Sequence, residues 1–229
     1  MKSIVVLTGA GMSAESGLKT FRDADGLWEG HDVMKVASPQ GYEENPELVL
    51  EFYNQRRRQL LQVNPNQAHY ALVELEKKYK VTIITQNVDD LHERAGSKHV
   101  LHLHGELLKV RSTTNPSLVL NWKYDLNLGD KDDEGHQLRP HIVWFGEDVP
   151  MIEPAIKICE QAEILIIIGT SLQVYPAASL MHYAPRDIRA YYIDPKPSIV
   201  SSDRIKVISQ PATLGVSKLV EDLLNDDQA

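Results

Sequence analysis

The chain has 229 residues, 42% of them hydrophobic, and its 24 Lys and Arg against 32 Asp and Glu give a formal net charge of −8. This length fits one large domain, or one domain with a small module, and the apolar content argues against disorder. A negatively charged surface repels phosphate backbones, so we expect no nucleic-acid partner, whereas a basic protein or peptide would be attracted.

The single cysteine, Cys159, excludes a disulfide framework and an all-cysteine metal site. It lies in "PAIKICEQAE", which reads as a helix, and we expect it to be buried. The apolar stretch at the N-terminus is too short for a signal-peptide core, and no run approaches the roughly 18 apolar residues of a membrane span. We therefore expect a cytoplasmic protein without a membrane partner.

The first half of the chain alternates strands and helices. Residues 3–8 read as a buried strand ending at glycines, and Pro46 and Asn66 stand where helices would begin. The expected elements are a strand at 3–8, helices at 46–62 and 66–78, and strands at 81–85, 100–104 and 141–145. Residues 20–45 are irregular and are expected to form a loop over a pocket.

The second half continues this alternation after an interruption. Residues 112–139 are polar and rich in turn formers, and they read as an inserted small module. The run "ILIIIG" at 164–169 is apolar without alternation, as strands covered on both faces are. A helix at 176–183, strands at 190–194 and 205–208 and a helix at 213–225 follow. The alternation predicts an α/β fold with a doubly wound parallel sheet.

The segment "IVVLTGAGMSAESGLKTFRD" at 4–23 contains a candidate phosphate-binding turn. Residues 9–14 fit the pattern G-x-G-x-x-A after a strand, and small residues let the backbone approach a pyrophosphate. A dehydrogenase would continue with a helix, a second strand and an acid about 20 residues on. Here "FRDADGLWEGHD" holds no strand, so the ordinary dehydrogenase fingerprint fails in its second half.

Amide and acidic side chains follow the strand at 81–85, in "TQNVDDLHERAG". Gln86, Asn87 and Asp89 would lie at the carboxyl edge of the sheet, where open α/β sheets bind ligands. They suit a carboxamide and ribose hydroxyls; the alternative is a turn with Asp89 or Asp90 capping the next helix.

Two further segments carry chemistry. In "HLHG", His104 ends a strand and is a candidate general base. His102 would point the same way, so a metal pair is a weaker alternative that lacks an obvious third ligand. "RPHIVWFGE" holds an apolar strand that would either accept an extended peptide at its edge or lie in the core.

Taken together, GAGMSAESGLKTFRD, TQNVD, the histidine-glycine pair, RPHIVWFGE, and GTS followed by Leu172 and Val174 resemble the sirtuins, over residues 2 to 224 and in the family order. The resemblance is to bacterial NAD-dependent protein deacylases of the desuccinylase and demalonylase type. It implies one catalytic domain over 1–229, with a Rossmann-type large lobe of about 1–30, 80–108 and 140–229. The smaller lobe would be helical over about 31–79 and hold the zinc-module position at 109–139.

The resemblance also implies the site. NAD would be a co-substrate, acyl-lysine proteins the partners, and a monomer is favoured. His104 and Asn87 match catalytic positions. The NAD site is matched by Gly9, Ala10, Gly11, Met12, Ser13, Ala14, Glu15, Phe21, Arg22, Asp23, Trp28, Gln86, Asn87, Val88, Asp89, Gly169, Thr170, Ser171, Asp194, Pro195, Lys196 and Ala212. Asp194 stands where the family usually has asparagine, which leaves its contact undetermined.

The implied reaction is removal of an acyl group from lysine. The acyl oxygen attacks the ribose carbon as nicotinamide leaves, and His104 acts as general base on a ribose hydroxyl. Val143, Phe145 and Gly146 match the groove for the acyl-lysine backbone. Tyr53 and Arg56 match the Tyr-x-x-Arg pair of sirtuins that prefer succinyl or malonyl lysine, because a guanidinium binds a carboxylate with two hydrogen bonds. Ala37 would leave room for the longer chain.

The chain departs from the family pattern at the zinc module. The family has two Cys-x-x-Cys pairs after the catalytic histidine, and here Ser112 and Asn115 occupy the places of the first pair. Neither residue replaces a thiolate, so we expect no structural zinc. The expected apolar anchors of the module are instead Trp122, Tyr124, Leu126 and Leu128. Arg57 and Arg58 are expected to be solvated.

Two other functions remain open from the residues. The same NAD site would serve a protein mono-ADP-ribosyltransferase, although an acyl pocket would then have no use. An NAD-binding regulatory module without activity is the non-catalytic alternative, and the presence of His104 and Asn87 argues against it.

Overall fold

The computed structural model describes residues 1–19, 27–28 and 30–226. Its centre is a six-stranded parallel sheet in the order β11-β10-β9-β1-β4-β5. The strands are β1 (Ser3–Thr8), β4 (Lys80–Thr85), β5 (Val100–His102), β9 (Ile164–Ile168), β10 (Arg189–Ile193) and β11 (Ile205–Ile208). The doubly wound parallel sheet predicted from the alternating elements is confirmed.

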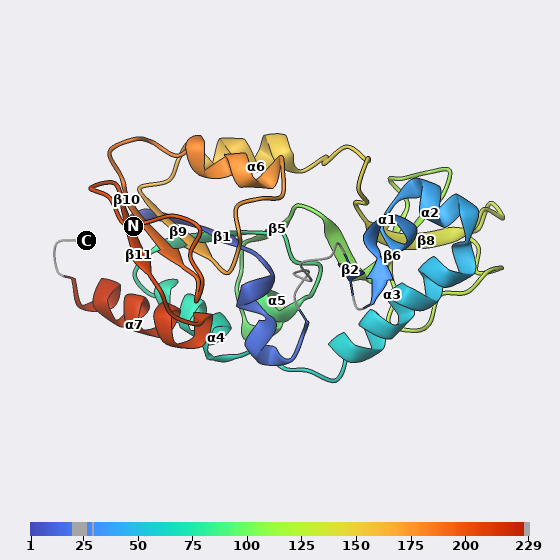
Figure 1. The fold of residues 1–229 in the computed structure, drawn as a ribbon, viewed down its shortest axis with the longest axis horizontal. Coiled ribbons are helices and arrows are strands. Elements are labelled where there is room, and N and C mark those ends of the chain that lie inside the picture. Colours follow the sequence, from blue (N-terminus) through green and yellow to red (C-terminus); the bar gives the residue numbers. More distant parts are fainter. Residues whose placement is uncertain (20–26, 29, 227–229) are drawn as a thin grey trace.

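Helices cover both faces of this sheet (Figure 1). On one face α4 (Gln67–Leu75) and α7 (Ala212–Asn225) pack against Ile4 and Val6 of β1. On the other face α6 (Ile152–Cys159) and the 3-10 helix η3 (Ala177–His182) pack against Val5 and Leu7. Both faces of β1 are thus buried, which explains why its central residues are apolar without alternation. Cys159 is fully buried in the second core, as expected.

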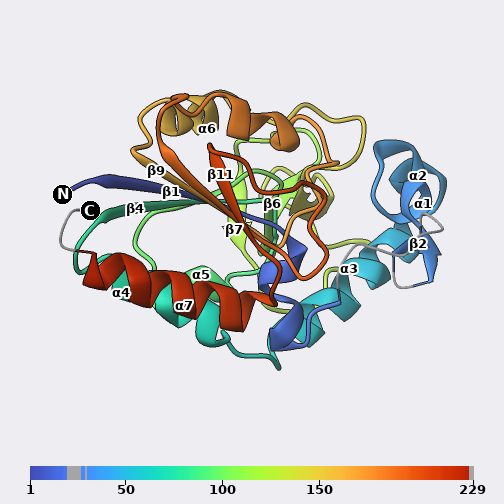
Figure 2. The same cartoon turned by 60° about the vertical axis from the view of Figure 1, so that its left-hand side comes forward.

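A second lobe lies beside the sheet, away from both chain termini (Figures 1 and 2). It combines α1 (Val33–Val36), α2 (Pro39–Glu44) and α3 (Pro46–Leu60) with an antiparallel sheet ordered β7-β6-β8. These strands are β7 (Val119–Asn121), β6 (Gly105–Ser112) and β8 (Leu138–Ile142), and a short β2 (Leu27–Trp28) pairs with β3 (His31–Asp32). The remaining helix, α5 (Leu91–Ala95), follows β4.

The packing differs from the predicted lobe boundaries in two places. The helix predicted at 66–78 is α4, whose Ala68 and Leu72 belong to the core of the large sheet, so the helical part of the small lobe ends before it. The strand predicted at 141–145 is β8, which begins at Leu138, ends at Ile142 and pairs with β6 in the small sheet, so residues 143–145 lie beyond it. Sequence periodicity identified both elements but not the partner against which each packs.

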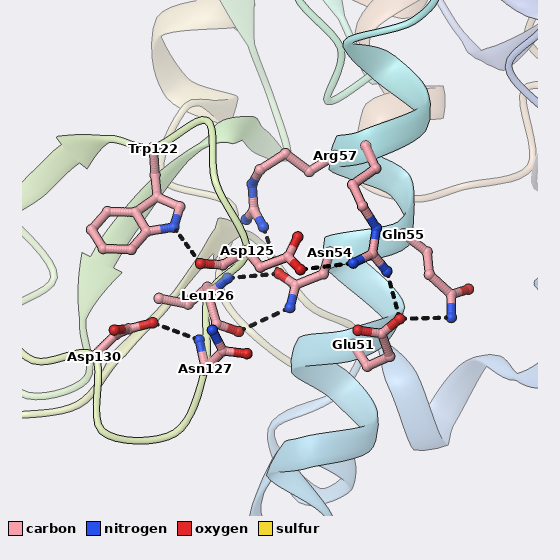
Figure 3. A network of polar contacts seen from close by, with 10 residues as sticks. Glu51, Asn54, Gln55, Arg57, Trp122, Asp125, Leu126, Asn127 and Asp130 are labelled. Carbon is pink, nitrogen blue, oxygen red and sulfur yellow. Dashed lines mark hydrogen bonds and ion pairs between the residues drawn. The ribbon is translucent and has the colours of Figure 1, made fainter.

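Arg57 corrects the expectation of a solvated basic face on α3. Its side chain is only 1% exposed, and its Nε donates to the Leu107 carbonyl while Nη1 donates to Asn54 Oδ1. Asn54 in turn exchanges two hydrogen bonds with the backbone of Leu126 (Figure 3). Arg58 is exposed as expected, and it pairs with Glu51 and Asp125. A helix turns about 100° per residue, so adjacent arginines face different surroundings.

The chain forms hydrogen-bonded turns at the zinc-module position. Ser112 Oγ accepts from the amides of Thr114 and Asn115, and Asn115 Oδ1 accepts from the Ser117 amide. Both side chains are oxygen or amide groups already engaged in turns, so these residues do not fit a zinc site. Across residues 1–19, 27–28 and 30–226, no group of three or more His, Cys, Asp or Glu side chains is placed to hold a metal.

Two of the four expected anchors of this module are wrong. Leu126 is fully buried and Trp122 packs partly against the same cluster. Tyr124 is 79% exposed and Leu128 is 48% exposed, so neither stabilises the module by burial.

The described part of the chain also contains no helix with the length and apolar composition needed to cross a bilayer.

The turns that follow β1 and β9 cross in close contact and form the floor of the site. Gly11 donates its amide to the Gly169 carbonyl, and a Cβ on Gly11 would lie 2.6 Å from the Gly169 Cα. Gly169 itself has a φ of +59°, which disfavours a side chain. The carboxyl ends of these adjacent strands meet at the point where the strand order reverses, which is where open α/β sheets bind ligands.

Candidate functional site

A cavity of about 310 Å³ is lined by both lobes. The large lobe contributes the turns after β1, β4 and β9, and the small lobe contributes α3 and the segment after β8. The sequence-predicted residues that line it are Gly9, Ala10, Ser13, Trp28, Ala37, Tyr53, Arg56, Gln86, Asn87, Val88, Asp89, His104, Val143, Phe145, Gly146, Gly169, Thr170 and Ser171. The structure therefore brings together motifs that lie far apart in the sequence.

The loop after β1 forms two short 3-10 turns, η1 (Ala10–Met12) and η2 (Ala14–Ser16). Asn66, at the start of α4, donates from Nδ2 to the Met12 carbonyl and to Ser16 Oγ. Asn87 donates from Nδ2 to the Gly9 carbonyl and to Ser13 Oγ. Side chains from two other elements thus fix this loop, which leaves its small residues at the cavity wall.

The amide loop after β4, residues 86–89, lies across the cavity floor. Gln86 donates to Thr170 Oγ1, which joins this loop to the turn after β9. Asp89 is buried, and burial raises the pKa of its carboxyl to about 6, although hydrogen bonds from Ser13 and Leu91 oppose that rise. The alternative reading of a capping turn is also partly correct, because the Asp89 carboxyl accepts from the Leu91 amide at the start of α5.

His104 lines the cavity at the junction of the two lobes. Its Nδ1 lies 3.1 Å from the Gln86 carbonyl oxygen, which only accepts, so Nδ1 carries the hydrogen. The other ring nitrogen, Nε2, is then unprotonated. Burial lowers the pKa of this imidazole, against a smaller opposing effect of the Gln86 hydrogen bond. The ring is therefore neutral at pH 7 and can accept a proton.

The small-lobe wall is built around Tyr53. Tyr53 is fully buried, and its phenol oxygen accepts a hydrogen bond from Trp144 Nε1 at 3.0 Å. Burial raises the pKa of this phenol well above its ordinary value, so it stays neutral and keeps its own proton for donation. One turn along α3, Arg56 donates to the Phe52 carbonyl, and its guanidinium carbon lies 3.8 Å from the Phe52 ring centroid.

The segment after β8 is hydrogen-bonded to Ala37, which follows α1, and to His104. Phe145 donates its amide to the Ala37 carbonyl, and Val143 donates to the His104 carbonyl. Glu147 accepts from Arg111 and Arg139, and the Arg139 guanidinium lies 3.4 Å from the Trp144 ring centroid. This charge cluster fixes the Trp144 indole against Tyr53.

Other predicted residues lie away from the cavity lining. Met12 and Ala212, the first residue of α7, are buried in the core on that face of the large sheet. The Glu15 carboxylate is exposed and accepts from the amide and hydroxyl of Thr213, at the start of α7. The remainder of this group is Gly11, Ala14, Asp194, Pro195 and Lys196, and Asp194 Oδ1 accepts from the Lys196 amide. Phe21, Arg22 and Asp23 lie outside the described residues.

Sequence reasoning missed two residues that organise this site. Trp144 lines the cavity and hydrogen-bonds Tyr53, whereas "RPHIVWFGE" reads as a strand that either accepts a peptide at its edge or lies in the core. His102 was considered as a metal partner of His104. Instead its Nε2 pairs with Glu93, and its Nδ1 contacts the Asn87 carbonyl. No local signal marks either contact, because each partner is at least nine positions away in the sequence.

A family model described as the Sir2 family matches residues 9–176. The chain belongs to the Sir2 family. Among curated Sir2 relatives, an NAD-dependent protein deacylase of Helicobacter pylori is 68% identical over 196 residues, covering 86% of this chain and 86% of that protein. Another of the same name, from Bacteroides thetaiotaomicron, is 56% identical and covers 98% of this chain and 99% of that protein.

Solved Sir2 structures show the same fold. A Sir2 homologue in complex with ADP-ribose superposes with a TM-score of 0.89 at 37% identity, covering 100% of this chain and 95% of that one. A complex of a Sir2 homologue with NAD gives a TM-score of 0.88 at 38% identity, over 97% and 90% of the two chains. The sirtuin resemblance drawn from the motifs is confirmed.

Proposed function

We propose that this chain is an NAD-dependent protein lysine deacylase that removes succinyl, malonyl and acetyl groups, yielding nicotinamide and O-acyl-ADP-ribose. The activity named for its curated relatives supports the reaction. The observation that carries the proposal is His104, a neutral imidazole whose position is fixed from the amide loop at the junction of both lobes. A cytoplasmic, monomeric enzyme remains part of the prediction.

The residues around the cavity fit NAD. The turns after β1 and β9 bring Gly9, Ala10 and Gly169 to the cavity wall, and small residues let the backbone approach a pyrophosphate. Asn87 and Asp89 are proposed to contact the nicotinamide and ribose, since amide and carboxyl groups match a carboxamide and hydroxyls. When bound, NAD supplies an electrophilic ribose carbon and a leaving group.

His104 is proposed to act as the general base. Its Nε2 would take a proton from a ribose hydroxyl, while its Nδ1–H would keep donating a hydrogen bond to the Gln86 carbonyl. Since burial lowers its pKa, the base stays unprotonated to a lower pH than an ordinary histidine. The acid limb of kcat/KM is therefore expected below pH 6.5, which is about the ordinary histidine value.

Tyr53 and Arg56 are proposed to recognise an acidic acyl group. The two stand three positions apart on α3, and both line the cavity. A substrate carboxylate would receive hydrogen bonds from the guanidinium and from the neutral phenol. Ala37, nearly buried beside them, is proposed to leave room for the acyl chain. Val143, Phe145 and Gly146 are proposed to hold the peptide backbone, with their cavity position in support.

The deciding experiment incubates succinyl-lysine and acetyl-lysine peptides with the protein, with and without NAD, and weighs all products. A deacylase releases free lysine peptide, nicotinamide and acyl-ADP-ribose only when NAD is present. A mono-ADP-ribosyltransferase would instead add ADP-ribose to protein, and a binding module would leave every mass unchanged. His104→Ala serves as the inactive control.

Acyl specificity is tested by Arg56→Met, with Arg58→Met as the matched control. Arg58 is on the same helix but exposed and paired to Glu51 and Asp125, so its loss should leave both activities unchanged. Loss of a charge-assisted hydrogen-bond pair predicts a fall of about ten- to a hundredfold in desuccinylation kcat/KM. Deacetylation should change little, and an unchanged desuccinylation would refute the assignment.

A further inference from the structure

Four successive carbonyl groups of the strand end and amide loop are held by the segment that carries His104. The Thr85 carbonyl accepts from the Leu103 amide, and the Val88 carbonyl accepts from the Leu107 amide. Between them, the carbonyls of Gln86 and Asn87 are contacted by imidazole Nδ1 atoms, each at 3.1 Å. The two histidines of "HLHG" are therefore hydrogen-bonded to adjacent residues of this loop.

The two histidines differ in their outer ring nitrogen. His104 lines the cavity and bonds the loop through Nδ1 alone, whereas His102 Nε2 also lies 2.7 Å from Glu93 Oε1 on α5. A carbonyl and a carboxylate both only accept hydrogen bonds, so His102 must donate from both nitrogens. A histidine that donates twice is an imidazolium, and this one is only 8% exposed in its side chain.

We propose that His102, as an imidazolium paired with Glu93, is a positioning residue that fixes Asn87 for NAD binding. This inference rests on the proposed function, in which Asn87 contacts NAD. Asn87 connects His102 to the loop after β1. Its carbonyl accepts from His102, and its side chain donates to Gly9 and Ser13 of that loop. A displacement of Asn87 would therefore shift the loop after β1, which it bonds, and the adjacent Gln86 carbonyl, which positions His104.

The charges around His102 sustain this protonated state. Burial alone would lower its pKa, but the hydrogen bond and charge of Glu93, with a contribution from Glu106 of β6, raise it above the ordinary value. The other titratable groups facing it are Asp89 and His92, and Asp89 is protonated up to about pH 6. When His102 loses a proton, Nε2–H stays on the charged Glu93. The Nδ1 lone pair then opposes the Asn87 carbonyl, and Asn87 loses its donor.

The two amide substitutions of His102 separate its two contacts. The Nδ2 of asparagine occupies about the place of Nδ1, so His102→Asn keeps a donor for the Asn87 carbonyl. His102→Gln reaches the place of Nε2 and keeps only the Glu93 contact. We expect KM for NAD to rise about tenfold in His102→Gln and to stay within about twofold of wild type in His102→Asn. KM for the peptide should change in neither.

A second pair of variants tests the charge. Glu93→Gln removes the carboxylate that keeps His102 protonated, so it should raise KM for NAD in wild type but have no effect in the His102→Asn background. In wild type, kcat/KM for NAD should fall on the alkaline side as His102 deprotonates, and His102→Asn should lose this limb while keeping the acid limb of His104.

The outcomes are distinct. Equal KM values for NAD in the Asn and Gln variants, or the same effect of Glu93→Gln in both backgrounds, would overturn the positioning role even if wild type is an active deacylase. Absence of NAD-dependent deacylation by wild type would instead refute the proposed function. Thermal unfolding of wild type and the four variants shows whether a change in KM reflects loss of the fold.

Discussion

His69 supports the contact between the start of α4 and the loop after β1, and we expect it to make folding sensitive to acid. Its Nδ1 accepts from the Asn66 amide at 3.2 Å, while Asn66 itself holds the Met12 carbonyl and Ser16. The ring is fully buried, with its centroid 4.9 Å from that of His92. Burial lowers the pKa of His69 to about 4, so the folded protein holds it neutral.

The magnitude follows from the difference between the folded and unfolded pKa. Below about pH 6.5 the unfolded chain binds a proton at this histidine and the folded chain does not, so stability falls with falling pH. The stabilising contribution is fully present above pH 6.5 and is lost as pH falls towards 4. Each pKa unit corresponds to about 1.4 kcal/mol, so the whole shift corresponds to about 3 kcal/mol.

The assay compares wild type with His69→Gln by urea unfolding at steps from pH 7.5 to pH 4.5. Glutamine at the third position of a helix can still accept from the Asn66 amide, but it does not titrate. The stability of wild type relative to the variant should fall by about 1.4 kcal/mol per pH unit below pH 6.5. The raised pKa of Asp89 cancels in this difference. The pKa of His92 stays low in both proteins, because burial is the largest cause of its lowering and the charge of His69 a smaller one. A difference that is constant over the whole range would refute the reasoning.

Three further predictions follow from buried contacts. Trp144→Phe removes the donor to Tyr53 and should lower desuccinylation kcat/KM about three- to tenfold. Deacetylation, measured by the same product analysis, should be nearly unchanged, and equal losses would contradict the role of the indole. Arg57→Met leaves the Leu107 carbonyl without its side-chain donor and should destabilise the protein by about 1–3 kcal/mol in urea unfolding. Arg58→Met should stay within about 0.5 kcal/mol, and equal effects would argue against the buried role. Cys159 is buried and has a pKa raised to about 12, so a maleimide should label it only in denaturant; rapid labelling of the native protein would be the opposite result.

The centre of the large sheet was predictable because β1 and β9 are continuous apolar runs covered on both faces. Ile164–Ile168 is fully buried, and the turns that carry Gly9, Asn87 and Gly169 follow directly from where such runs end. Strand ends of a parallel sheet meet at one edge, so locating the strands was enough to bring these turns together. The order of the motifs then indicated the family.

The small lobe was harder to predict because its contacts depend on pairings between distant segments. Three consecutive arginines in "RRR" look alike in the sequence, and only Arg57 meets the Leu107 carbonyl, 50 positions away. Similarly, Tyr124 and Leu126 stand two positions apart, as residues on one face of a strand would, but only Leu126 is buried. Residue type sets the cost of burial, whereas the tertiary pairing decides which side chain is buried.

His104 occupies the point at which the chain passes from one lobe to the other, and this placement constrains how the site can change. β5 of the large sheet ends at His102, and β6 of the small sheet begins at Gly105. Gly105 has a φ of +83°, and a Cβ there would lie 2.0 Å from the His141 carbonyl oxygen, so the crossing is tightly packed. The His104 imidazole is hydrogen-bonded to the Gln86 carbonyl of the large lobe, and the His104 backbone carbonyl accepts from the Val143 amide of the small lobe. A rotation between the lobes would strain one of these two hydrogen bonds. The geometry of His104 as the proposed general base therefore depends on the relative position of the two lobes, and on contacts such as those of His102 with the amide loop.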